Sequence, residues 1–180
     1  MAVTSEVFSL WYVPPPGSLQ KVQETIQQLA SRYSAPVFPA HMTLVGGIRG
    51  PEATVRRISE ELVDTLEPIG GHITCVDYGS IYHQCVFLKV ECTEELEFQY
   101  RLAQRKFSMD ENVQYMPHIS LLYSDIDQKE RERLTREQQK GSFDDKGRIG
   151  FDTIELWYTP PEDISLGSWR RLESYSLKSK

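Results

Sequence analysis

The feature that most constrains this chain is a tetrapeptide pattern that occurs twice, as HMTL at residues 41–44 and HISL at residues 118–121. Each copy places a histidine two residues before a hydroxyl side chain within an apolar run. In a β-strand, residues i and i+2 point to the same face, so His41 should lie beside Thr43 and His118 beside Ser120. A lone histidine in a strand is usually structural, whereas two in the same pattern indicate a shared site.

The segments around the two motifs also repeat. An apolar strand at Phe8 precedes His41 by 33 residues, and one at Val86 precedes His118 by 32 residues. Apolar segments follow the two histidines after 32 and 33 residues, at Ile73 and Phe151. Two copies are too few for a solenoid. We therefore interpret residues 1–180 as one domain of two pseudo-symmetric lobes, each contributing its histidine strand to a central cleft.

Hydrophobic periodicity predicts helices between short strands. Apolar residues recur three or four apart in four segments, which predicts helices at residues 18–33, 51–67, 96–107 and 128–140. Ser18 should cap the first helix, and Gly70 and Gly71 should end the second. Alternating or continuous apolar runs predict strands at residues 7–13, 41–44, 71–79, 86–90, 118–121 and 151–159. This order favours the α+β class, with antiparallel or mixed sheets and helices on their outer faces.

Composition limits the partners and the compartment. The formal charge of −6 disfavours a surface that tracks long RNA or DNA, although a local pocket could hold a small anion. Three cysteines without CxxC spacing predict buried thiols in a reducing compartment. The N-terminus lacks the basic region of a signal peptide, and no apolar stretch is long enough to span a bilayer. We expect a cytoplasmic monomer that does not bind membranes.

Two histidines and two hydroxyls in one cleft suit in-line attack on a phosphate ester. A neutral histidine takes a proton from the attacking oxygen, and a protonated one gives a proton to the leaving oxygen; an imidazole pKa of about 6.5 allows both states. The hydroxyls of Thr43 and Ser120 would hydrogen-bond the non-bridging phosphate oxygens. This scheme requires no cofactor and no metal, and it does not decide which of His41 and His118 is the base.

The paired motifs resemble the 2H phosphoesterase superfamily, whose signature is two H-x-[ST]-aliphatic strands facing a cleft. The chain length, the opening FSLWYVPPP and Tyr123 are most similar to the cyclic phosphodiesterases that process by-products of tRNA splicing. The resemblance implies a bilobal fold of two antiparallel sheets and metal-independent hydrolysis of ADP-ribose 1″,2″-cyclic phosphate or nucleoside 2′,3′-cyclic phosphates. It implies that His41 and His118 are catalytic and that Thr43 and Ser120 bind phosphate. It also implies that Trp11 and Tyr123 contact the substrate.

Other interpretations remain open. Related superfamily members cleave 2′-5′ oligonucleotides or RNA ends, and a third possibility is a nucleotide-binding module without turnover. Residues 46–50, GGIRG, could cradle a phosphate, but they lack the Walker lysine pattern and are more typical of a plain turn. His72 fits H-x-T without a partner in the other half, and His83 has no hydroxyl two residues later, so we expect neither in the site. Residues 129–140 alternate in charge and should form a solvated helix face.

Overall fold

The computed structural model describes residues 6–140 and 147–179. The first five residues of the N-terminal segment lie outside this range. The helices are α1 (Gln20–Tyr33), α2 (Glu52–Val63), α3 (Glu94–Lys106) and α4 (Gln128–Lys140), with a short 3-10 turn, η1 (Tyr82–Gln84). The strands are β1 (Val7–Val13), β2 (Met42–Arg49), β3 (Ile69–Tyr78), β4 (Val86–Val90), β5 (His118–Leu122), β6 (Arg148–Phe151), β7 (Thr153–Tyr158) and β8 (Arg170–Ser176).

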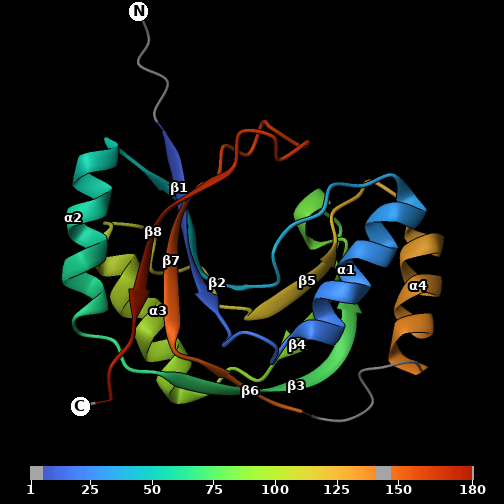
Figure 1. The fold of residues 1–180 in the computed structure, drawn as a ribbon, viewed down its shortest axis with the longest axis horizontal. Coiled ribbons are helices and arrows are strands. Elements are labelled where there is room, and N and C mark those ends of the chain that lie inside the picture. The colour runs from blue at the N-terminus through green and yellow to red at the C-terminus, as the bar shows by residue number, and fades with distance from the viewer. Residues whose placement is uncertain (1–5, 141–146, 180) are drawn as a thin grey trace, which may run out of the picture.

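All eight strands belong to one sheet in the order β6-β3-β4-β5-β2-β1-β7-β8, and every neighbouring pair is antiparallel. The predicted α+β class and antiparallel pairing are therefore confirmed. The two sheets that the resemblance implied are joined in the middle, where β2 and β5 pair through Met42 and Ile119. The sheet curls about this narrow join (Figure 1), so its two halves face each other.

The helices cover the outer faces of the sheet, as predicted, but each half is covered by helices from both sequence repeats. Helix α1 contacts β5 and α4 contacts β3, whereas α3 contacts β2 and α2 contacts β7 and β8. Figure 1 shows α2 and α3 on one side of the molecule and α1 and α4 on the other. The repeats are thus interlocked, because each supplies helices to both halves.

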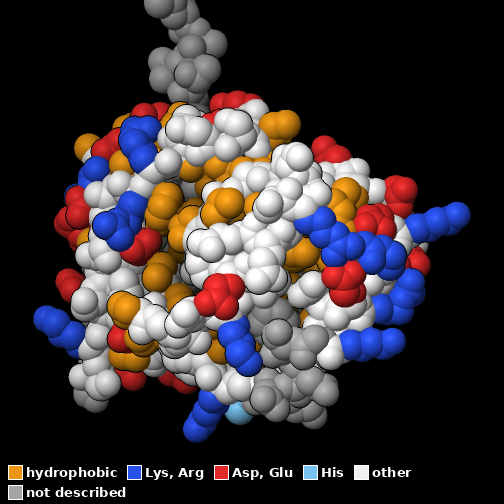
Figure 2. All heavy atoms as spheres, turned by 45° about the vertical axis from the view of Figure 1, so that its right-hand side comes forward, with side chains coloured by type: hydrophobic (Ala, Val, Ile, Leu, Met, Phe, Trp, Pro, Cys, Tyr) orange, Lys and Arg blue, Asp and Glu red, His pale blue; other side chains and the backbone are white. Residues whose placement is uncertain are grey.

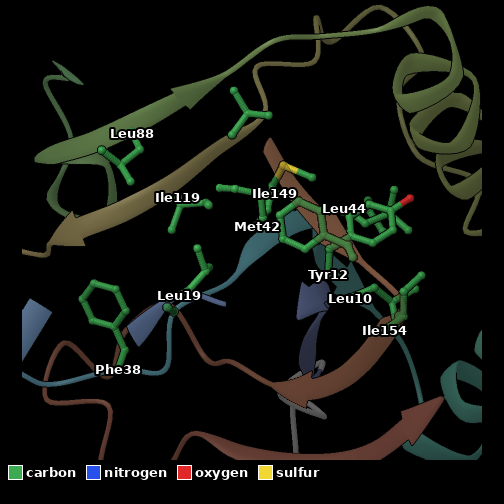
Figure 3. Close-up of a cluster of buried hydrophobic side chains, with 14 of the residues drawn as sticks. Leu10, Tyr12, Leu19, Phe38, Met42, Leu44, Leu88, Ile119, Ile149 and Ile154 are labelled. Carbon is green, nitrogen blue, oxygen red and sulfur yellow. The ribbon is translucent and has the colours of Figure 1, made fainter. Parts of the chain in front are cut away.

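The hydrophobic core lies between the sheet and these helices. Met42 and Ile119, which are 1% and 0% exposed, point into it together with Leu44 and Leu88 (Figure 3). Because side chains alternate along a strand, the residues next to Met42 and Ile119 point to the opposite face. The core therefore anchors the two histidine strands by one face and leaves the other face to the cleft.

The second helix is shorter than predicted. It ends at Val63 instead of Glu67. Pro68 accounts for the non-helical Glu67, because a proline disfavours helical geometry in the residue before it. Gly70 and Gly71 do not end this helix; they lie within β3. Glycine suits Gly71, because a Cβ there would stand 2.8 Å from Cγ1 of Val90.

The predicted strand at residues 151–159 is also wrong, because it is two strands. Phe151 ends β6, which pairs with β3, and Thr153 begins β7, which pairs with β1 in the other half of the sheet. The chain crosses between the halves at Asp152. Phe151 is thus not the counterpart of Ile73, and the last strand, β8, has no equivalent in the predicted repeat.

Three local expectations need comment. Ser18 does not cap α1, because its hydroxyl donates to the carbonyl of Pro15 over 2.7 Å. The cysteines are free, but only Cys85 is buried, while Cys75 is partly buried and Cys92 is exposed. Across the described residues, no helix has the length and apolarity needed to cross a membrane.

Candidate active site

The two predicted motifs meet at the centre of the sheet. Next to the Met42–Ile119 pair in the antiparallel register stand His41 with Ser120 on one side and Thr43 with His118 on the other. These four side chains line one cleft of about 280 Å³. The predicted substrate contacts line the same cleft, so the structure brings together all six predicted site residues: His41, Thr43, His118, Ser120, Trp11 and Tyr123.

The two histidines are held in the same way. Nδ1 of His41 lies 2.7 Å from the carbonyl oxygen of Pro39, and Nδ1 of His118 lies 2.8 Å from that of Met116. A carbonyl oxygen only accepts hydrogen bonds, so Nδ1 carries the hydrogen in both rings. In each neutral ring Nε2 is therefore the nitrogen that can take up a proton.

Burial disfavours the protonated form of both histidines. Desolvation lowers the pKa of His41 to about 4, although the hydrogen bond to Pro39 acts in the opposite direction. A charge on the nearby His118 also lowers the pKa of His41. Burial likewise lowers the pKa of His118, against the effect of its bond to Met116. Of the two, His41 is the more deeply buried, at 5% exposure, whereas His118 is partly exposed.

Of the two cleft hydroxyls, one already has a backbone partner. Oγ of Ser120 is buried and donates to the carbonyl oxygen of His83 over 3.1 Å. Thr43 is partly exposed at the cleft, and its carbonyl oxygen accepts a 2.8 Å hydrogen bond from the hydroxyl of Tyr115. Because a hydroxyl can turn about its C–O bond, both groups can donate to an anion placed between the histidines.

The two predicted aromatic contacts are packed against other rings. Trp11 is 2% exposed and stacks on His41, with ring centroids 3.6 Å apart and planes 12° apart. The other face of Trp11 packs on Trp157. Tyr123 is 4% exposed and stacks on Phe38 with centroids 3.8 Å apart. Trp11 thus supports the His41 ring, and a direct contact of Trp11 or Tyr123 with substrate stays a prediction.

His83 lines the cleft although no motif marks it. It lies on η1, and its ring stacks on Trp169 from the β7–β8 loop, with centroids 5.8 Å apart. Its Nε2 is buried and has no hydrogen-bond partner among the described residues. The H-x-[ST] pattern describes two residues on one face of a strand. It therefore cannot identify His83, which a turn brings to the cleft.

Residues 46–50 are not a plain turn, contrary to the prediction. Gly46 and Gly47 lie within β2, where extra residues opposite β1 shift the register between Val45 and Ile48. Gly47 has φ +74°, which glycine adopts readily. Such a bulge lets the strand continue, and it carries Gly46, Gly47 and Arg49 into the cleft wall.

The two features assigned to the surface are largely confirmed. His72 is an exposed residue of β3. Lys or Arg and Asp or Glu side chains mingle on the face that Figure 2 brings forward, where helix α4 lies. On α4, Arg133 forms ion pairs with Glu130 and Glu137 at 2.6 and 2.8 Å. Arg131 departs from the pattern, because it is buried and donates to backbone carbonyls.

Three imidazoles, those of His41, His83 and His118, line the cleft. Among residues 6–140 and 147–179, no group of three or more His, Cys, Asp or Glu side chains is arranged to hold a metal ion. The site therefore consists of imidazoles, hydroxyls, aromatic rings and one guanidinium.

Solved structures show where this fold occurs. Escherichia coli LigT complexed with ATP superimposes with a TM-score of 0.62 and 12% identity, covering 97% of this chain and 99% of LigT. The protein TT0787 of Thermus thermophilus gives a TM-score of 0.60 at 14% identity, covering 95% of this chain and 97% of that one. These likenesses show the fold, and with the paired motifs and the family match given next they make the chain a phosphoesterase of the 2H superfamily, as the resemblance implied.

The sequence comparisons identify a particular family among the proteins that share this fold. The model of the cyclic phosphodiesterase-like protein family matches residues 7–146, and the chain belongs to this family. The chain is 26% identical over 179 residues to the cyclic phosphodiesterase of Arabidopsis thaliana, covering 97% of each. It is a hydrolase that acts on phosphoric ester bonds.

Proposed function

We propose that the protein hydrolyses small cyclic phosphates to phosphomonoesters by a metal-independent, two-histidine mechanism. The substrate class comprises nucleoside 2′,3′-cyclic phosphates and ADP-ribose 1″,2″-cyclic phosphate. The observation that carries this proposal is the matched pair of histidines, each with Nδ1 bound to the carbonyl two residues earlier. Binding alone would not require two imidazoles held so that the same nitrogen of each can exchange a proton.

His41 is the better candidate for the general base, and His118 for the general acid. Deep burial against Trp11 keeps the pKa of His41 near 4, so this ring is neutral at pH 7 and can take a proton from water. His118 is more exposed, and a bound phosphate anion would favour its charged form. Water then attacks phosphorus while one ring P–O bond breaks. His118 gives its proton to the leaving oxygen.

The hydroxyls complete the scheme. Thr43 and Ser120 stand between the histidines in the register of β2 and β5, where they can donate to the non-bridging oxygens. These oxygens gain charge as water adds, so the two hydrogen bonds strengthen toward the transition state. Donation from Ser120 requires its hydroxyl to leave the carbonyl of His83.

The size of the cleft favours a small substrate over a polymer. The cavity of about 280 Å³ lies at the lower end of the volumes usual for small-ligand pockets, roughly 300 to 1,000 Å³. LigT, which shares the fold, has been crystallised with ATP and with 3′-AMP. The alternative, cleavage of 2′-5′ oligonucleotides or RNA ends, would need basic residues beyond the cleft, which a net charge of −6 makes scarce. A cytoplasmic, monomeric enzyme that binds neither long nucleic acid nor membranes stays a prediction.

The test is a panel assay with product identification. Purified protein is incubated with 2′,3′-cyclic AMP, ADP-ribose 1″,2″-cyclic phosphate and a single-stranded RNA, and the products are assigned by phosphorus NMR. We expect conversion of the cyclic phosphates to monoesters, slowed by roughly 10²- to 10⁴-fold in His118→Ala and retained in the matched surface variant His72→Ala. Faster cleavage of RNA would support the alternative, and binding without turnover of any substrate would indicate a nucleotide-binding module.

A further inference from the structure

The charge of the cleft differs from that of the whole protein. The chain has 26 acidic residues against 20 basic ones. None of the described residues that line the cleft is an Asp or Glu, and the one Lys or Arg among them is Arg49. The side chain of Arg49 is exposed and has no ion pair or hydrogen bond with any described residue. A cation without a counterion in a wall free of carboxylates favours an anionic ligand.

The bulge in β2 sets the position of this cation. Along β1, alternate residues Val7, Ser9 and Trp11 line the cleft. Trp11 pairs with Thr43 in the catalytic half of the cleft, and Val7 pairs with Arg49. Four residues of strand therefore separate the two pairs, a distance of about 13 Å. The long side chain of Arg49 can span part of this distance, and the sugar of a bound nucleotide can span the rest.

The wall between the two pairs is polar, and its Ser9 and Thr159 side chains are only 8% and 6% exposed. Oγ of Ser9 and Oγ1 of Thr159 are 2.8 Å apart, and both side chains line the cleft. Opposite them, a Cβ on Gly46 would stand 3.3 Å from Oγ of Ser9 and 3.6 Å from Cγ2 of Thr43. A side chain at this position would crowd the hydroxyl of Ser9, so glycine keeps that hydroxyl in place. The wall between the two pairs thus carries two hydroxyls and ends at Arg49.

We propose that Arg49, with the hydroxyls of Ser9 and Thr159, forms a second anion subsite. It binds a phosphate group that the substrate carries in addition to its cyclic phosphate, so the enzyme prefers cyclic phosphates with a further phosphoryl or diphosphoryl group. This inference rests on the proposed function, because it takes the ring phosphate to lie between His41 and His118. A guanidinium offers paired N–H donors that match two phosphate oxygens.

A matched pair of substrates tests the subsite. Adenosine 2′,3′-cyclic phosphate and its 5′-phosphorylated form differ in one phosphate group. We expect the protein to hydrolyse the phosphorylated form with a kcat/KM higher by roughly ten- to a hundredfold, the worth of a charge-assisted hydrogen bond. In Arg49→Gln this ratio should fall to near one. The control Arg57→Gln, which removes an exposed arginine of α2, should keep the parental ratio.

The outcomes separate the subsite from the proposed function. Equal hydrolysis of both substrates by the parental protein, or a ratio that survives Arg49→Gln, would overturn the subsite and leave the proposed function intact. Failure to hydrolyse either substrate would instead overturn the proposed function. Because Arg49 is exposed, the preference should also shrink when the salt concentration rises from about 50 to 500 mM. A ratio independent of salt would count against the guanidinium.

Discussion

The buried, neutral state of His41 predicts how folding stability depends on pH. The pKa of His41 is about 4 in the folded protein, against a usual value of 6.5. Below pH 6.5 the unfolded chain takes up a proton that the folded protein does not, so acid favours unfolding. The stabilising contribution is fully present above pH 6.5 and is lost as the pH falls towards 4. The difference between these two pKa values lowers the free energy of unfolding by about 2 kcal/mol between pH 7.5 and pH 5.

The assay is urea unfolding of the parental protein and of His41→Asn at pH 7.5 and pH 5. Asparagine keeps an N–H donor near the position of Nδ1 but does not titrate. The variant will be less stable at both pH values, because it leaves a cavity beside Trp11. Between pH 7.5 and pH 5, the free energy of unfolding should therefore fall by about 2 kcal/mol less in His41→Asn than in the parental protein. In the control His72→Asn, an exposed position, the pH dependence should match that of the parental protein. Equal losses in His41→Asn and the parental protein would refute the reasoning.

The remaining predictions concern turnover of a cyclic phosphate. His41→Ala and His118→Ala should each lower kcat by roughly 10²- to 10⁴-fold in a protein that circular dichroism shows to be folded; near-parental rates would exclude the two-histidine mechanism. Thr43→Ala and Ser120→Ala should cost about 1 to 3 kcal/mol of transition-state stabilisation, measured as kcat/KM. The pH profile of kcat/KM should be bell-shaped with both limbs below 6.5, because burial lowers the pKa of both histidines; limbs above 7 would contradict this. Activity should survive exhaustive EDTA treatment, and its loss with recovery on adding zinc or manganese would indicate a metal mechanism.

Sequence patterns predict well where each residue's position follows from its near neighbours. Helix α4 spans residues 128–140, as its periodicity predicts, because alternating charges and a buried Leu134 define its face locally. The H-x-[ST] pattern succeeds for the same reason: strand alternation alone places each imidazole beside a hydroxyl. The relation between the two motifs could be inferred from the matched distances before each histidine, whereas the match after the histidines, Ile73 with Phe151, is wrong.

Patterns fail where long-range pairing determines the structure. Residues 151–159, FDTIELWYT, have the composition of one strand, and nothing in them shows that the chain crosses to the other half of the sheet at Asp152. His83 and Arg49 reach the cleft through a turn and a bulge, which are set by the register with neighbouring strands. Net charge does not predict the charge of the cleft, for a related reason. The whole chain carries −6, but no Asp or Glu is among the described residues that line the cleft.

The two histidines share one backbone arrangement but lie in different surroundings, which suits the two different roles that we propose for them. The repeat gives His41 and His118 the same backbone hydrogen bond, so the same nitrogen faces the cleft in both. The environments differ because the neighbouring strands are not copies. His41 stacks flat on Trp11, which Trp157 of β7 covers from behind, whereas the ring of His118 meets Phe87 at 56° and stays partly exposed. An acid–base pair needs one ring that is neutral and one that can be charged. In the mechanism we propose, the aromatic packing that buries His41 makes it the base, and the more exposed His118 is the acid.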